Sequence, residues 1–201
     1  MAEFKNTHVH GIEVAMMAQR NPMNSWHLAD SDSLAIGERD LDLAQRLLKG
    51  GDEHAKAMRF INVTVDVTAP RYWFAELDTY KFVDQISTST MHKLFDKTRE
   101  ISLDDFVYNE HNKDFIELTI GVLNDMREKY FNGGDKLEIL KTAKMILPEG
   151  YLNKRTIRLN YQCIRNMYKQ RKSHRLTEWN TDFVKWVETL PYSKELITYG
   201  L

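Results

Sequence analysis

Residues 60–69 constrain the fold more than any other part of this sequence. Apolar and polar side chains alternate strictly there: Ile61, Val63, Val65 and Val67 against Asn62, Thr64, Asp66 and Thr68. A period of two is the pattern of a β-strand that is buried on one face only. Pro70 then ends the run. The sequence therefore predicts a sheet with one apolar face and one polar face that is solvated or lines a site.

Apolar residues with helical spacing dominate the rest of the chain. Helices are predicted over residues 38–49, 71–81, 114–131, 136–146, 161–172 and 177–190, and further strands over 8–19 and 153–159. Residues 21–33 are predicted to form a loop, and residues 87–90 a hydroxyl-rich turn. Helices that are segregated from a few strands, without regular alternation, indicate an α+β fold.

Composition narrows the class of protein. A chain of 201 residues without linkers or repeats is expected to form a single domain, 1–201. A net charge of -1 argues against a dedicated nucleic-acid binder, whose charge is usually lopsided. Cys163 is the only cysteine, so no disulfide forms within the chain, and a reducing compartment, the cytoplasm, is expected. No apolar run approaches the roughly 20 residues that cross a bilayer, so no membrane association is expected.

Three features of the sequence are candidates for chemistry. His8 and His10 would share one strand face and supply half of a metal site, although a plain surface pair is the simpler interpretation and no metal is expected. Cys163 lies mid-helix and is expected to be a buried structural thiol rather than a nucleophile. The basic run 165–175 would either bind phosphate or form a solvated helix face.

Two separated stretches also share the spacing of a known signature. In the first, His54 precedes the central strand, and the strand ends in Ala69-Pro70. Thr79-Tyr80-Lys81 stands at the end of the aromatic-rich helical segment 71–81. Seven residues separate Lys81 from Ser89.

The second stretch begins at Leu147-Pro148 and continues through Asn160, Gln162 and Asn166 to Arg171. Read together, the two stretches resemble the flavin-dependent thymidylate synthases (ThyX). The signature of that family is Arg-His-Arg, seven residues and Ser, followed later by Leu-Pro and a spaced Asn, Arg, His and Arg motif. The spacing matches in both stretches, and Asn160 and Arg171 stand at the matching Asn and final Arg.

The resemblance implies a fold and an activity. It implies an α+β, ThyX-like fold with a small central, mostly antiparallel sheet packed with several helices. ThyX enzymes are homotetramers that bind FAD at subunit interfaces. They methylate dUMP to dTMP with methylenetetrahydrofolate as carbon donor and NADPH as reductant. The cofactor carries the difficult chemistry, and the protein holds and polarises the reactants.

The resemblance also implies roles for individual residues. Ser89 and Arg171 would be catalytic and would bind the phosphate and base of dUMP. The residues implied to contact FAD are His54, Thr79, Tyr80, Lys81, Asn160 and Gln162. Ser89, Asn160 and Arg171 are therefore expected to converge on one anion-holding cleft.

The side chains of the signature depart from the family more than its spacing does. Thr79 and Tyr80 cannot carry the charge of the residues that they replace, and Lys81 keeps a charge but loses the arginine fork. The missing anion contacts would have to come from Arg71, Arg155, Arg158 or Lys56. Three hypotheses follow: a flavin-dependent nucleotide methylase, a non-catalytic nucleotide-binding or interaction protein on the same scaffold, and a nucleic-acid binder that uses residues 165–175.

Overall fold

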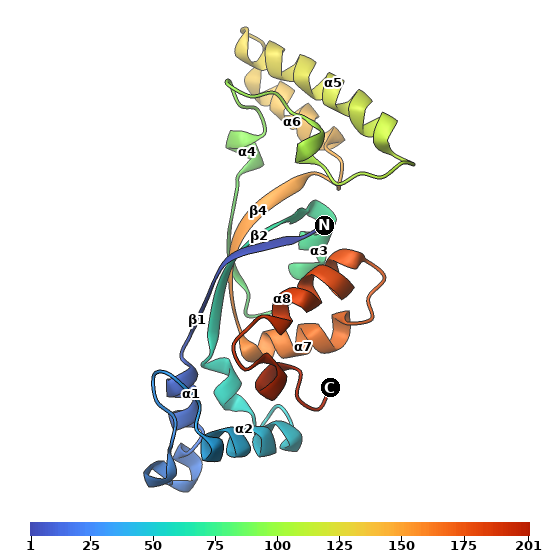
Figure 1. Ribbon diagram of the computed structural model, residues 1–201. Helices are drawn as coiled ribbons and strands as arrows, with labels where there is room; N and C mark the ends of the chain where they lie inside the picture. Colours follow the sequence, from blue (N-terminus) through green and yellow to red (C-terminus); the bar gives the residue numbers. More distant parts are fainter.

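Figure 1 shows the computed structural model of the chain, in which residues 1–201 are all described. Four strands form one sheet: β1 (Glu3–His10), β2 (Asn62–Pro70), β3 (Asp84–Ser87) and β4 (Leu152–Asn160). Their order across the sheet is β1-β2-β4-β3, and every neighbouring pair is antiparallel. The expected α+β class, with a small antiparallel sheet packed with helices, is confirmed.

The helices form three groups around this sheet (Figure 1). One face is covered by α3 (Arg71–Leu77), α7 (Tyr161–Arg171) and α8 (Val184–Glu188). One end carries α1 (Ile12–Ala18) and α2 (Glu38–Gly50), and the other carries α4 (Thr90–Lys93), α5 (Lys113–Phe131) and α6 (Lys136–Ile146). Four predicted helices match α2, α5, α6 and α7 to within one residue. None of the helices is both long and apolar enough to span a bilayer.

Strand β2 is buried as its alternation predicts. Val63, Val65 and Val67 have no exposed surface and belong to a core of 28 buried residues beneath the covering helices. On the opposite face, Thr64 and Asp66 lie beside Arg158 and Thr156 of β4. One face of the sheet is therefore apolar and closed, and the other is polar and open.

The predicted strand 8–19 is correct only for His8–His10 and wrong from Gly11 onward. The chain leaves β1 at His10, turns at Gly11 and continues as helix α1. Gly11 has a φ of 89°, and a Cβ at this position would lie 2.3 Å from the carbonyl oxygen of Phe60. Only glycine fits this turn without strain. The apolar residues after Gly11 therefore belong to a helix.

Four other predicted elements need correction. The helix predicted over 71–81 ends at Leu77, and residues 177–190 contain a wide-turned π-helical segment, Glu178–Phe183, before α8. Residues 84–87 form the edge strand β3, so the predicted hydroxyl-rich turn begins inside a strand. The predicted loop 21–33 contains two short 3₁₀ helices, Asn21–Met23 and Trp26–Leu28, and others occur at Lys56–Arg59 and Leu103–Asp105.

The α5–α6 hairpin has a core of its own. Nine buried residues, among them Ile116, Leu123 and Leu140, form a second cluster separate from that of the sheet. The N-terminal part of α5 carries an apolar stripe that points outward: Phe115, Leu118 and Val122 are between 39% and 69% exposed. Further along the helix, Met126 and Tyr130 pack against the second cluster.

Candidate functional site

Arg171, at the C-terminal end of α7, is held by side chains from three segments. Its Nη1 donates to the carboxylate of Glu76 in α3, and its Nε donates to the hydroxyl of Tyr80 over 2.7 Å. The guanidinium also stacks on Trp179, 4.8 Å from the ring centre. The structure therefore brings two predicted site residues, Tyr80 and Arg171, into direct contact. The guanidinium already has an acidic partner there.

His174 completes this cluster around Glu76. Its Nε2 lies 3.4 Å from the same carboxylate oxygen, and its Nδ1 accepts from the backbone N–H of Leu176 over 3.2 Å. An imidazole that accepts at Nδ1 carries its proton on Nε2, which then donates towards Glu76. The hydroxyl of Thr79 donates to the backbone carbonyl of Glu76 over 2.7 Å. Thr79 is thereby turned back onto the end of α3.

Lys81 and Asn160 both contact Cys163, at the N-terminal end of α7. The Cys163 thiol donates to the carbonyl of Lys81 over 3.6 Å, and the side-chain oxygen of Asn160 accepts from the backbone N–H of Cys163 over 3.0 Å. Gln162 donates to Asn166, whereas its Oε1 is buried without a partner. Burial raises the pKa of the Cys163 thiol, which suits a structural role. Three predicted FAD contacts therefore gather at one end of the sheet.

Ser89 lies towards the opposite end of β4, where it begins α4. It lines a cavity of about 240 Å³ with the neighbouring hydroxyls of Thr88, Thr90 and Thr68. Two lysines and two aspartates complete the polar wall, namely Lys93, Lys154, Asp104 and Asp105. Hydroxyl and ammonium groups are hydrogen-bond donors that suit phosphate oxygens. This small cavity can therefore hold part of an anionic ligand.

Ser89, Asn160 and Arg171 do not share a cleft within one chain. The backbone of Thr88 bonds to that of Lys154, which is six residues, or about 20 Å of strand, from Asn160. Arg171 is separated from Asn160 by the length of α7, about 16 Å. The prediction of a single cleft is wrong for Ser89 and Asn160 within one chain, because these two residues lie towards opposite ends of β4.

His54 lies on the rim of a cavity between α1 and α2, apart from the Arg171 cluster and the Ser89 cavity. It is exposed, approaches Glu53 to 3.8 Å and lines a cavity of about 810 Å³ between α1 and α2. The cavity extends to Phe60, just before β2 begins. Since Asn62 of β2 pairs with Asn160, His54 belongs to the same end of the sheet as Asn160.

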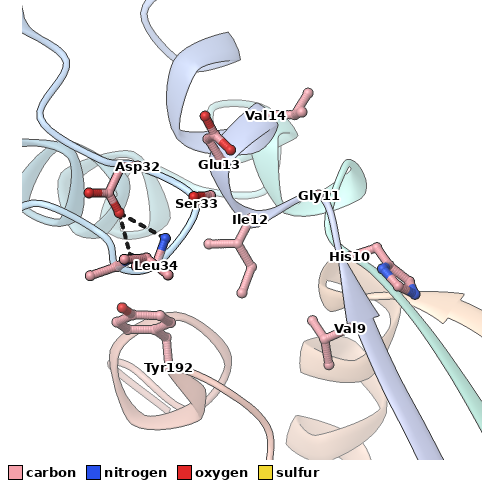
Figure 2. Close-up of a pocket in the computed structure, with 11 residues that line it drawn as sticks. Val9, His10, Gly11, Ile12, Glu13, Val14, Asp32, Ser33, Leu34 and Tyr192 are labelled. Carbon is pink, nitrogen blue, oxygen red and sulfur yellow. Dashed lines mark hydrogen bonds between the residues drawn. The ribbon is translucent and has the colours of Figure 1, made fainter.

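The paired histidines of β1 are not joined by a third ligand. The rings of His8 and His10 stack with their centres 6.3 Å apart, and no group of three or more His, Cys, Asp or Glu side chains is arranged to hold a metal ion. Figure 2 shows His10 beside a cavity of about 300 Å³, pointing away from Asp32 and Glu13. Asp32 accepts hydrogen bonds from the backbone of the following turn, which hold the pKa of its carboxyl below its usual range.

The basic run 165–175 is not one continuous charged surface. Arg165 is buried and donates to two backbone carbonyls near the C-terminus, and burial lowers its pKa. Arg171 is neutralised by Glu76. Lys169, Lys172 and Arg175 are exposed. Two of the five cations are therefore structural, which shortens the anion-binding surface that the sequence suggests.

No protein-family model matches this sequence, and no curated protein matches it significantly. Solved structures do. ThyX from Helicobacter pylori, complexed with FAD and dUMP, is 17% identical and has a TM-score of 0.73 over 97% of both chains. The chain has a ThyX-like fold. The UMP/dUMP methylase PolB from Streptomyces cacaoi is 14% identical, with a TM-score of 0.64 over 98% of this chain and 93% of its own.

On this ThyX-like fold, the arginines in or near the second motif are paired with acidic residues of the same chain. Arg155 donates to Asp78 over 2.7 Å, Arg158 donates to Asp84 over 3.0 Å, and Arg171 is paired with Glu76. Segment 76–84 therefore neutralises three cations of β4 and α7. Sequence reasoning missed these pairs. The signal was three acids in the stretch where the ThyX signature is basic.

The exposed groups of the ThyX-like fold fit FAD best near Lys81. FAD combines a diphosphate with a planar ring, so its site needs cationic donors, amides and an aromatic surface. Lys81 and Arg59 are exposed, and Phe82, which follows Lys81 in sequence, is 81% exposed. The amide N–H groups of Asn160 and the buried, unpartnered Oε1 of Gln162 add hydrogen-bonding capacity. The donor set present at this end of the sheet suits the cofactor.

Proposed function

We propose that this protein is a flavin-dependent pyrimidine nucleotide methylase, which converts dUMP to dTMP with methylenetetrahydrofolate and NADPH. The observation that carries the proposal is the likeness to ThyX and PolB along nearly the whole chain. The anion-suited groups around Lys81 and Ser89 support it. The single cysteine, Cys163, is consistent with a cytoplasmic enzyme that needs no thiol nucleophile.

In this proposal the residues of the chain bind and orient the reactants. Lys81, Asn160 and Gln162 hold the cofactor, His54 approaches it from the α2 side, and the segment of Thr79 and Tyr80 faces it. Bound FAD would supply the hydride that completes the methyl group. The Ser89 hydroxyl donates to the nucleotide phosphate. Arg171 contacts the nucleotide through Nη2, the guanidinium nitrogen left free by Glu76 and Tyr80.

The distances within one chain support a site that is shared between copies. Ser89 and Asn160 are about 20 Å apart along β4, so one nucleotide cannot contact the Ser89 and Arg171 regions and reach the cofactor residues within one chain. We therefore propose a homotetramer in which neighbouring chains contribute complementary parts of each site. The exposed apolar stripe of α5 and the open polar face of the sheet are surfaces available for assembly.

The decisive experiment is to purify the chain and record its visible absorption spectrum before and after incubation with FAD. A flavin spectrum, followed by formation of dTMP from dUMP with both co-substrates, is the expected result. The Lys81→Ala variant should weaken FAD binding by about tenfold, as loss of a charge-assisted contact does. A colourless protein that takes up no added FAD would exclude this function.

Sharing of sites between chains has a separate test. Ser89→Ala and Arg171→Met chains are each expected to be inactive, whereas mixed oligomers of the two should recover activity at about one quarter of the sites. The same mixture made with a chain that carries both substitutions should stay inactive. If the two single variants never complement each other, both residues act within one chain and the proposed arrangement is wrong.

A second candidate function is favoured by the three internal ion pairs. Because Arg155, Arg158 and Arg171 already have acidic partners, the chain can be a non-catalytic nucleotide-binding or interaction protein on this scaffold. In that case dUMP at 100 times its Kd should stabilise the fold by roughly 2.7 kcal/mol without any flavin. Thermal unfolding with and without dUMP separates this function from the first.

A further inference from the structure

The two edge strands of the sheet differ in how they are protected from other strands. The register of β1 shifts between Lys5 and His8, as at a β-bulge, and the lysine is exposed. Bulges and lysines are means by which edge strands avoid pairing with other chains. Strand β3 has neither: its four residues pair with β4 in regular register, and all four are exposed. The outer edge of β3 is therefore open to a further strand.

The pairing of β3 with β4 shows which backbone groups of this edge are free. The N–H of Thr88 donates to a carbonyl of β4 over 2.9 Å, just beyond the end of β3. Alternate residues of an antiparallel ladder bond to the neighbouring strand, so the backbones of Asp84 and Ile86 face β4 as that of Thr88 does. The N–H and C=O groups of Gln85 and Ser87 then point away from the sheet, where an added strand could bond to them.

Large apolar side chains are exposed along the same segment. Phe82 and Ile86 are each 81% exposed, and Met91 in α4 is 45% exposed. Ile86 is paired with Thr156, so its side chain lies on the open polar face of the sheet. A single exposed apolar residue is ordinary, but three of them beside an unprotected strand edge indicate an interaction surface.

The sequence of β3 is complementary to itself in one antiparallel register. When Ile86 stands opposite its own copy, Gln85 of each chain meets the partner's Ser87, and each of these residues can both donate and accept a backbone hydrogen bond. Asp84 then faces the partner's Thr88 and no like charges are opposed. A shift of the register in either direction would place Ile86 opposite Asp84 or Thr88, so the apolar pair is lost.

We propose that β3 pairs with β3 of a second copy about a two-fold axis at Ile86, which joins the two sheets into one. The same patch serves on both chains, so the contact closes on itself as a dimer contact. In this register Val83 lies opposite the partner's Ser89. The pairing deepens the proposed function, and this consequence rests on that function, because the partner's Ser89 comes beside the segment of Lys81. The association itself requires neither flavin nor nucleotide.

Cysteine cross-linking of the ligand-free protein tests the position of the two-fold axis. Cα atoms of a non-hydrogen-bonded antiparallel pair are about 4.5 Å apart, within the range of a disulfide. Ile86→Cys should therefore form a disulfide-linked dimer under mild oxidation. The matched control His8→Cys, at an exposed position on the opposite edge strand, should not. Both are made in a chain that carries Cys163→Ser, so that no other thiol is present.

Removal of one backbone donor tests the hydrogen bonds between the copies. Ser87→Pro deletes the outward N–H and no bond to β4, and proline is tolerated on edge strands. Thermal unfolding checks that the variant is folded. In sedimentation experiments its dissociation constant should be at least about tenfold higher than that of the matched control Ser87→Ala, which keeps the N–H.

Several results would overturn the proposal. These are equal association of Ser87→Pro and Ser87→Ala, an Ile86→Cys chain that forms no dimer, and a His8→Cys chain that dimerises as readily. A chain that stays monomeric would leave this edge to a different protein and would overturn it too. Formation of dTMP despite these results would reject only the pairing, whereas a β3 dimer that takes up no FAD would reject only the proposed function.

Discussion

Replacing Arg171 by alanine would leave the carboxylate of Glu76 with only His174 beside it. The side chains of Arg171 and Glu76 are 16% and 32% exposed, so the pair lies between a surface salt bridge and a buried one. Exposed pairs contribute about 0–1 kcal/mol, and breaking a buried pair costs about 3–5 kcal/mol. Loss of the stack on Trp179 adds about 0.5–1 kcal/mol. We expect Arg171→Ala to lower the free energy of unfolding by about 2–3 kcal/mol.

Urea denaturation and thermal unfolding of the ligand-free protein measure this loss. For a chain of this size, a loss of about 2–3 kcal/mol corresponds to a fall of roughly 5–10 °C in Tm. Lys172→Ala is the matched control, since the next residue is an exposed cation and its removal should change stability by less than about 0.5 kcal/mol. A double-mutant cycle with Glu76→Gln should give a coupling energy of about 1–2 kcal/mol.

An Arg171→Ala variant as stable as the unaltered chain would refute this reasoning. It would mean that the pair with Glu76 contributes nothing to the free protein and that Arg171 is available entirely to a ligand. A coupling energy near zero, with a large effect of Arg171→Ala alone, would instead assign the loss to packing against Trp179.

Three further outcomes follow from the structure. Hydrogen bonds, the largest from Thr156 and then those from Asn6 and Lys154, lower the pKa of the Asp66 carboxyl. Its contribution to the free energy of unfolding is therefore present above about pH 4 and is lost as the pH falls. Asp66→Asn should make the urea midpoint depend less on pH between about 5 and 2. Asp135→Ala removes the side chain that caps α6 and should cost about 1 kcal/mol by the same assay, whereas Asp135→Asn should be nearly neutral. Gly11→Ala should lower the free energy of unfolding by about 2 kcal/mol or more in denaturation experiments, because the φ of Gly11 is 89° and a Cβ would meet the carbonyl of Phe60. No change in that free energy would mean that the turn relaxes to accept a Cβ.

Local patterns in the sequence predict those helices and strands that bury one face and expose the other. The alternation around Val65 identifies β2, and helical spacing identifies α2, α5, α6 and α7. No such pattern predicts strand β3, because all four of its residues are exposed and it lies at the edge of the sheet, paired only with β4. The turn at Gly11 is missed because its reason is a contact with Phe60, about fifty residues away.

The candidate site shows the same division. Spacing placed Lys81 and Asn160 in matching motifs, and the structure puts them at one end of the sheet. The pairing of Arg171 with Glu76 spans 95 positions, and no local pattern reveals which cation an acid will meet. In the proposed homotetramer, contacts between chains decide whether Ser89 and Arg171 reach one nucleotide, and the spacing within one sequence does not encode such contacts.

The separate core of the α5–α6 hairpin bears on how the protein moves. A cluster of nine buried residues should open at a lower free energy than the 28-residue core beneath the sheet, and hydrogen exchange should show two protection levels. Ser89 lies on the connection between these units, beside strand residues Thr68 and Lys154 on one side and Asp104 on the other. Asp104 belongs to the 3₁₀ helix Leu103–Asp105, which packs on the second core through Leu103. Each opening of the hairpin would therefore break up the Ser89 cavity. An interaction that stabilises the hairpin would also lengthen the time that an anion could stay bound in this cavity.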